Sequence, residues 1–300
     1  MPARSSAKNR RVPQSNQPLP PVDPLWLLKA GGAVVAVGLL CAYLTFCGLF
    51  YVEQWQLVLH PSRTVAQTPA NVGLAFQPVR FGDETAGKPQ LTGWWIPSDT
   101  PADPTALVLH GETGSMADAL STATALHNAR LNVLLFDYRG YGASDGKHPT
   151  EQTMRADAES ALLYLTQNRQ LSPAAIVVYG SHLGASLAVT LCANHPQLPA
   201  VILQTADGDT ESRVRRDPRT ASLPVSLLFH QRFALADAIH RLQTPKLLIS
   251  YINGPPPEEA VRAADPKTTA ELPPNADPTV LTAVLRRFLD SYVSNPVSLL

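Results

Sequence analysis

The stretch AAIVVYGSHLGAS, residues 174–186, decides the fold, because an apolar run passes there into a helix-like pattern through a turn of small residues. A continuously apolar, β-branched run predicts a strand that is buried on both faces of a parallel sheet. Gly180 and Gly184 flank the turn, where strand and helix must pass close to each other. We therefore predict a tight strand-to-helix turn with His182 at its apex.

Similar strand-like runs lie on both sides of this one, and helical periods separate them. Residues 151–168 have such a period behind a Thr150 cap, and residues 278–292 have another, with Asp277 as N-cap and Pro278 as the first helical residue. This alternation predicts a doubly wound α/β domain. Residues 207–240 contain no strand-like run, and we interpret them as a lid-like insertion over the sheet. The expected strands are 74–81, 91–97, 105–111, 132–138, 174–180, 200–205, 245–251 and a weaker 268–272.

An uncharged apolar run at residues 30–52 is long enough, at about 1.5 Å per residue, to cross a bilayer core of roughly 30 Å. A signal peptide has a shorter apolar core, and a buried core helix is the other alternative. We predict a transmembrane anchor at 25–52. Basic residues lie before the span, which by the positive-inside rule leaves the N-terminus in the cytoplasm. The polar residues 1–24 predict a disordered basic tail, and residues 53–300 form the domain on the exported, periplasmic or lumenal side.

The composition argues against several kinds of partner. The 24 basic and 24 acidic residues cancel, so no net field favours nucleic acid. Three cysteines form neither a disulfide framework nor a metal-ligand cluster. We therefore expect no nucleic-acid partner, no cofactor and no metal, and a membrane partner through residues 25–52.

Five motifs follow one another along the chain: LTGWWIP (91–97), LVLHGETGSM (107–116), NVLLFDYRGYGASDGKHPTE (132–151), IVVYGSHLGAS (176–186) and LPVSLLFHQRFALADAIHRLQTPKLLI (223–249). In this order they resemble the α/β-hydrolase superfamily, in its serine-aminopeptidase-like and monoacylglycerol-lipase-like branch. The resemblance implies an α/β-hydrolase fold, with a mostly parallel eight-stranded sheet flanked by helices, over nearly all of the exported region. It also implies a serine nucleophile on the turn, a histidine base, a carboxylate and backbone oxyanion donors.

The same resemblance shows a degenerate catalytic triad. The nucleophile position is occupied by His182, and the acid position, after the strand at 245–251, falls on Gly254. The base is expected near Asp277, and no histidine follows His240. The resemblance assigns the remaining positions to the oxyanion loop and pocket (His110, Gly111, Glu112 and Leu183) and to the structural elbow (Gly180 and Gly184).

These substitutions favour a membrane-anchored pseudo-hydrolase that binds a small molecule, a lipid or a protein partner. An active hydrolase of esters, lipids or peptides is the alternative, with His182 as a nucleophile or base. Ser181 as a displaced nucleophile is disfavoured, because it precedes the apex and should point away from the site. A metal site would combine His110 and His182 with Glu112, Asp207 and Asp209, but their spacing matches no metal motif.

Overall fold

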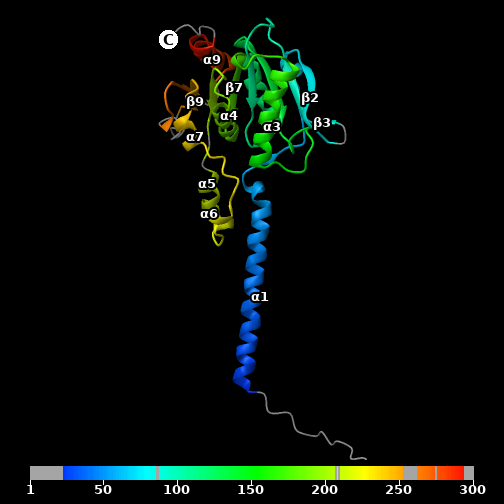
Figure 1. Ribbon diagram of the computed structural model, residues 1–300, viewed down its shortest axis with the longest axis vertical. Coiled ribbons are helices and arrows are strands. Elements are labelled where there is room, and N and C mark those ends of the chain that lie inside the picture. Colours follow the sequence, from blue (N-terminus) through cyan, green and yellow to red (C-terminus); the bar gives the residue numbers. More distant parts are fainter. Residues whose placement is uncertain are drawn as a thin grey trace, which may run out of the picture. The chain divides into compact units, whose positions relative to one another are not determined.

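The alternation of apolar runs and helical periods produces one eight-stranded sheet flanked by helices (Figure 1). The computed structural model describes residues 23–85, 88–206, 208, 210–252, 262–273 and 276–293. The strand order is β10-β9-β8-β7-β4-β6-β3-β2. Only β3 runs against the others, because it pairs antiparallel with both β2 and β6. The strands are β2 (Gln77–Thr85), β3 (Lys88–Ile96), β4 (Thr105–Leu109), β6 (Asn132–Asp137), β7 (Ile176–Ser181), β8 (Val201–Gln204), β9 (Lys246–Tyr251) and β10 (Lys267–Leu272).

Two hydrophobic cores cover the two faces of the sheet. Successive residues of a strand point to opposite faces, and in β4 the side chain of Leu107 packs in one core while that of Val108 packs in the other. Helices α3 (Glu151–Leu163) and α4 (Leu183–Asn194) contribute to the core of Leu107. Helices α2 (Leu120–Asn128) and α9 (Pro278–Tyr292) contribute to the core of Val108. The predicted mostly parallel eight-stranded sheet, flanked by helices on both faces, is therefore correct.

The chain divides into two units between Leu49 and Phe50. Helix α1 (Pro24–Glu53) begins in the first unit and is long and apolar enough to cross a membrane. Its bounds agree with the predicted span at 25–52 within one residue at each end. The predicted tail at residues 1–24 lies almost entirely outside the described residues.

The region 207–240 contains helices and, in its described part, no strand. Its helices are α5 (Thr210–Arg216), η6 (Pro218–Thr220), α6 (Val225–Leu228) and α7 (Ala236–Arg241). Several short elements have no clear sequence signal: a two-residue pairing of β1 (His60–Pro61) with β5 (Thr113–Gly114), the turns η1 (Gln54–Leu57), η2 (Pro69–Val72), η3 (Met116–Ala119) and η5 (Pro173–Ala175), and a π-helical turn η4 (Tyr164–Asn168) after α3.

Candidate functional site

The turn between β7 and α4 presents His182 in a strained backbone conformation. β7 ends at Ser181 and α4 begins at Leu183, and His182 between them has φ 51° and ψ −121°. A positive φ of this kind costs about 1–3 kcal/mol for a residue with a Cβ, so it persists only where the surroundings impose it. The side chain of His182 is exposed. The turn therefore displays His182 as hydrolases with such an elbow display their nucleophile.

Two glycines allow the backbone segments around this turn to approach each other. A Cβ added to Gly180 would lie 2.5 Å from the carbonyl oxygen of Gly184. A Cβ added to Gly184 would lie 2.1 Å from the carbonyl oxygen of Leu109, at the end of the neighbouring strand β4. Neither distance leaves room for a side chain. The elbow therefore requires glycine at both positions.

The backbone N–H of Leu183, the first residue of α4, donates a hydrogen bond to the carboxylate oxygen Oε2 of Glu112 at 3.3 Å. In hydrolases with this elbow, the N–H of the residue after the nucleophile stabilises the oxyanion of the transition state. A helix N-terminus also favours a negative charge. The carboxylate of Glu112 thus occupies a position that a hydrolase keeps for its substrate.

The loop that carries Glu112 is fixed by hydrogen bonds to its backbone. The carbonyl oxygen of Glu112 accepts from the N–H of His60 and from the hydroxyl of Tyr141, each at 2.8 Å. The hydroxyl of Tyr138 donates to the carbonyl of His110 at 3.1 Å. A Cβ added to Gly111 would lie 3.2 Å from the Cβ of His182, so this loop lies directly against the elbow.

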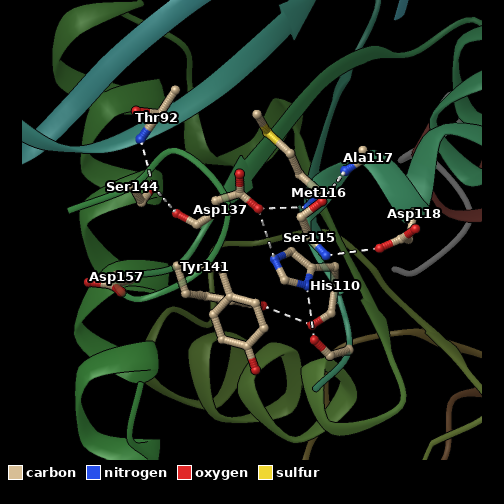
Figure 2. A network of polar contacts seen from close by, with 12 residues as sticks. Thr92, His110, Ser115, Met116, Ala117, Asp118, Asp137, Tyr141, Ser144 and Asp157 are labelled. Carbon is tan, nitrogen blue, oxygen red and sulfur yellow. Dashed lines mark hydrogen bonds and ion pairs between the residues drawn. The ribbon is translucent and has the colours of Figure 1, made fainter. Parts of the chain in front are cut away.

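A buried histidine and a buried carboxylate bond to the backbone at the two ends of this loop (Figure 2). The Nδ1–H of His110 donates to the carbonyl of Gly111 at 2.9 Å, and its Nε2 lies 3.9 Å from Oδ1 of Asp137. Burial lowers the pKa of His110 to about 4, so the ring is neutral near pH 7. The same Oδ1 of Asp137 accepts from the N–H of Met116 at 2.7 Å, and burial raises the pKa of Asp137 to about 6. These groups position the loop.

A pocket of about 470 Å³ lies between the loop and the elbow, and polar groups make up much of its lining. Its lining includes Glu112, Ser181 and His182 together with Gln204 and Tyr251. The amide Nε2 of Gln204 donates to the hydroxyl of Tyr251 at 2.8 Å, and the hydroxyl of Tyr179 donates to Oε1 of Gln204. At the end of β9, close in sequence to the expected acid, the pocket is therefore lined by a hydrogen-bonded tyrosine.

The described part of the chain contains no hydrogen-bond or ion-pair partner for the imidazole of His182. Gly254, at the expected acid position, lies outside the described residues. Asp277, near the expected base position, caps α9: its Oδ1 accepts from the N–H of Thr279 at 2.8 Å, and this bond lowers the pKa of the carboxyl. The structure thus gives the carboxylate of Asp277 a structural partner in its own helix.

The described residues contain no group of three or more His, Cys, Asp or Glu side chains arranged to bind a metal. Of the five residues considered for such a site, Asp207 and Asp209 lie outside the described residues. Nδ1 of His110 is engaged by the Gly111 carbonyl, and its ring packs 4.6 Å from that of Tyr138, measured between centroids.

Two further pocket groups, Gln204 and the hydroxyl of Tyr251, are not part of any sequence motif. Their positions carry a usable signal, because Gln204 and Tyr251 end neighbouring buried strands. Ligands of open α/β sheets bind at the carboxyl ends of the strands. Glu112 was assigned to the pocket, but its bond to the N–H of Leu183 depends on tertiary structure.

Solved structures with the same arrangement define the class of fold. An esterase of Pyrococcus furiosus superposes with a TM-score of 0.61 at 21% identity, covering 79% of this chain and 98% of the esterase. An α/β hydrolase of Vibrio vulnificus superposes with a TM-score of 0.55 at 21% identity, covering 76% of this chain and 82% of the other. These similarities establish an α/β-hydrolase fold.

The family follows from the sequence comparison. The family model described as serine aminopeptidase, S33, matches residues 100–275, and the chain belongs to this family of α/β hydrolases. An uncharacterised protein of Mycobacterium tuberculosis is 32% identical over 199 residues, which are 66% of this chain and 69% of the relative. Protein bem46 of Schizosaccharomyces pombe is 28% identical over 247 residues, covering 77% of this chain and 79% of that protein. The superfamily identified from the motifs is confirmed.

Proposed function

We propose that this protein is a membrane-anchored pseudo-hydrolase that binds a small molecule, a lipid or a protein partner and does not hydrolyse it. The observation that carries the proposal is the hydrogen bond from the N–H of Leu183 to the carboxylate of Glu112. A hydrolase needs that donor for the developing oxyanion. The carboxylate of Glu112 stands where the oxyanion of a substrate would lie. It occupies the N–H donor, and its charge repels the negative charge that would develop on the substrate.

The surroundings of His182 support the same proposal. A serine hydrolase needs a nucleophile, a base and a carboxylate that fixes the tautomer of the base, and these groups act as a unit. An exposed imidazole with no partner among the described residues lacks this arrangement. The pocket of about 470 Å³ persists without the triad, because its walls are the loop, the elbow, η3, the first turn of α2 and the ends of β8 and β9.

The proposed location is a membrane with a single span. Helix α1 meets the length and apolarity that a bilayer requires. Basic residues before the span and none until Arg63 after it favour an N-terminus in the cytoplasm, with the domain on the periplasmic or lumenal side. Fractionation and protease protection of the full chain test this topology: digestion of the tail from the domain side would contradict it.

An active hydrolase centred on His182 is the second candidate. It is favoured by one observation, the exposed imidazole at the apex of the elbow and at the edge of the pocket. Imidazole can act as a nucleophile. Turnover of nitrophenyl esters by the unmodified chain, abolished in His182→Ala, would replace the first proposal with this one.

The experiment that tests the pseudo-hydrolase uses the full chain in detergent with nitrophenyl esters and a fluorophosphonate probe. We expect no turnover above buffer and no labelling, and His182→Ser alone should restore neither. The decisive comparison adds Glu112→Ala to a variant that also carries His182→Ser, Gly254→Asp and Asp277→His. Because loss of one oxyanion donor costs about 100-fold or more in rate, Glu112→Ala should raise any restored activity by a similar factor.

Glu112→Gln in the same background is the matched control. It removes the negative charge while leaving an amide oxygen near the donor. Its activity should therefore lie between that of the background with Glu112 retained and that of the background with Glu112→Ala. Labelling of the unmodified chain at Ser181, the last residue of β7, or at Ser186, which is buried in α4, would show instead that a serine next to this elbow is a working nucleophile.

A further inference from the structure

The first residue after α1, Gln54, is buried although it is polar, because it binds the insertion at 207–240. Its amide Nε2 donates to the carbonyl of Leu228 at 3.1 Å, and its Oε1 accepts from the N–H of His230 at 2.7 Å. The ring of Tyr51 lies 4.9 Å from the ring of His230, measured between centroids. Residues 228–230 are therefore attached to the chain where the apolar helix ends, at Glu53.

Helix α6 ends at Leu228, within this attachment. Its first residue Val225 and the following Phe229 are buried in the core. Leu227 is 80% exposed, the highest fraction for a large apolar side chain among the described residues. One exposed leucine alone needs no explanation in a soluble protein. Its position next to the attachment at Gln54 places it close to the end of a helix that would cross a bilayer.

The charge of this part of the chain differs from that of the whole. Residues 210–232 contain five arginines and two acidic residues, whereas the full chain has equal numbers of basic and acidic residues. Arg219 pairs with Asp217 at 2.6 Å and Arg232 with Glu211 at 3.4 Å. Arg215 and Arg216 are exposed at the end of α5, where the described residues provide no ion-pair partner for them. This excess of positive charge is complementary to anionic lipid headgroups.

We propose that residues 210–232 dock on the lipid surface of the membrane that α1 spans. Leu227 enters the boundary of the acyl chains, and Arg215 and Arg216 contact anionic headgroups. An apolar residue beside basic ones is the chemistry of a segment that lies in the membrane interface. The inference rests on the proposed membrane span, and it adds a second membrane contact, made by the insertion itself.

Hydrogen–deuterium exchange of the full chain in nanodiscs tests the docking. The discs contain either phosphatidylcholine alone or phosphatidylcholine with phosphatidylglycerol at about three to one, and detergent micelles are the reference. We expect amides of residues 221–228 to exchange about tenfold more slowly in the anionic discs than in the micelles. Each arginine near an anionic surface contributes roughly a factor of five, so Arg215→Glu with Arg216→Glu should remove this protection, and Leu227→Ser should weaken it.

Matched controls change the same residue types elsewhere in the domain. Leu163 is 48% exposed on α3, and Arg287 is exposed on α9. Leu163→Ser and Arg287→Glu should leave exchange at 221–228 unchanged. If the amides of residues 221–228 are protected equally in neutral and anionic discs, the proposed recognition of anionic headgroups is wrong. If they are protected only in discs that hold two copies of the chain, the segment binds a second copy and does not dock on lipid.

Failure of the span and failure of the docking give different results. If alkaline carbonate releases the full chain from membranes without detergent, the proposed anchor is wrong. If the chain remains embedded and residues 221–228 exchange equally in discs and micelles, the anchor stands and the docking is wrong.

Discussion

On one side of the pocket the side chains are hydrogen-bonded to the backbone, and on the other side the displayed side chain is exposed to solvent. On the loop side, the hydroxyls of Tyr138 and Tyr141 donate to the loop backbone, and His110 bonds to the next carbonyl. On the elbow side, the strained backbone is fixed by glycines, while the displayed side chain of His182 is exposed. The fold therefore depends on the loop bonds and the glycines and makes no use of the side chain at the apex. Hydrolysis can be lost at such a site without loss of the fold.

The largest expected effect comes from breaking the scaffold at Gly184. In Gly184→Ala, the new Cβ would meet the carbonyl oxygen of Leu109 at 2.1 Å, so α4 must move away from β4. Overpacking of this kind costs about 3 kcal/mol or more when backbone must shift. Chemical denaturation of the full chain in detergent measures this loss of unfolding free energy.

Gly73→Ala is the matched control. Gly73 has φ 78° and no atom within 4 Å of an added Cβ, so its cost comes from the backbone conformation alone. We expect about 1–2 kcal/mol. Equal losses at Gly73 and Gly184 would contradict the close approach of α4 to β4.

A smaller, pH-dependent effect comes from the loop side. Burial lowers the pKa of His110 from its ordinary value of 6.5 to about 4. Above pH 6.5 the ring is neutral in both states. As the pH falls from 6.5 to 4, the unfolded chain binds a proton at this residue and the folded chain does not, so folding stability is lost. His110→Asn removes this titration, and its stability relative to the unmodified chain should rise by up to about 3 kcal/mol between pH 7 and pH 4.

Denaturation curves at pH 7, 6, 5 and 4 measure this difference. Tyr138→Phe removes another support of the same loop, the hydroxyl that donates to the His110 carbonyl, without changing a group that titrates in this range. Its destabilisation should therefore be nearly constant with pH. A difference between His110→Asn and the unmodified chain that stays constant with pH would show that His110 gains its proton in the folded state.

The smallest expected effect is that of a substitution at His182, the apex of the elbow, and it increases the unfolding free energy where the others decrease it. His182→Gly relieves the positive φ of 51° and removes an exposed side chain, so it should stabilise the chain by about 1 kcal/mol. Ala221→Gly is the control, because Ala221 is exposed with φ −57° and should lose about 0.5–1 kcal/mol. Destabilisation by His182→Gly would mean that the imidazole has a partner in the folded state.

The sequence was sufficient to predict the strands that are buried on both faces. The predicted runs 174–180, 200–205 and 245–251 agree with β7, β8 and β9 within two residues, because continuous apolar runs end where the sheet ends. The edge strand β2 begins at Gln77 and not at residue 74, since Leu74 and Phe76 before it pack in the core on one face of the sheet without joining the strand pairing.

The contacts that define the candidate site were less predictable. Glu112 and the N–H of Leu183 are 71 residues apart, and their approach depends on the crossing of α4 over the end of β4. The β1–β5 pairing spans two residues in each strand, too few for a periodic pattern. The sequence predicts that Glu112 lies in the loop, but the direction of its carboxylate is a property of the folded chain.

The attachment of Gln54 to residues 228–230 also affects how the chain is made. Gln54 leaves the ribosome early, and its partners Leu228 and His230 follow 174 and 176 residues later. At a synthesis rate of about 5–20 residues per second, this delay is on the order of ten seconds or more. During that interval the amide Nε2 of Gln54 has the carbonyl of Tyr51 as an acceptor but lacks the carbonyl of Leu228. Formation of this contact therefore marks a late step of translation, when most of the domain has already been synthesised.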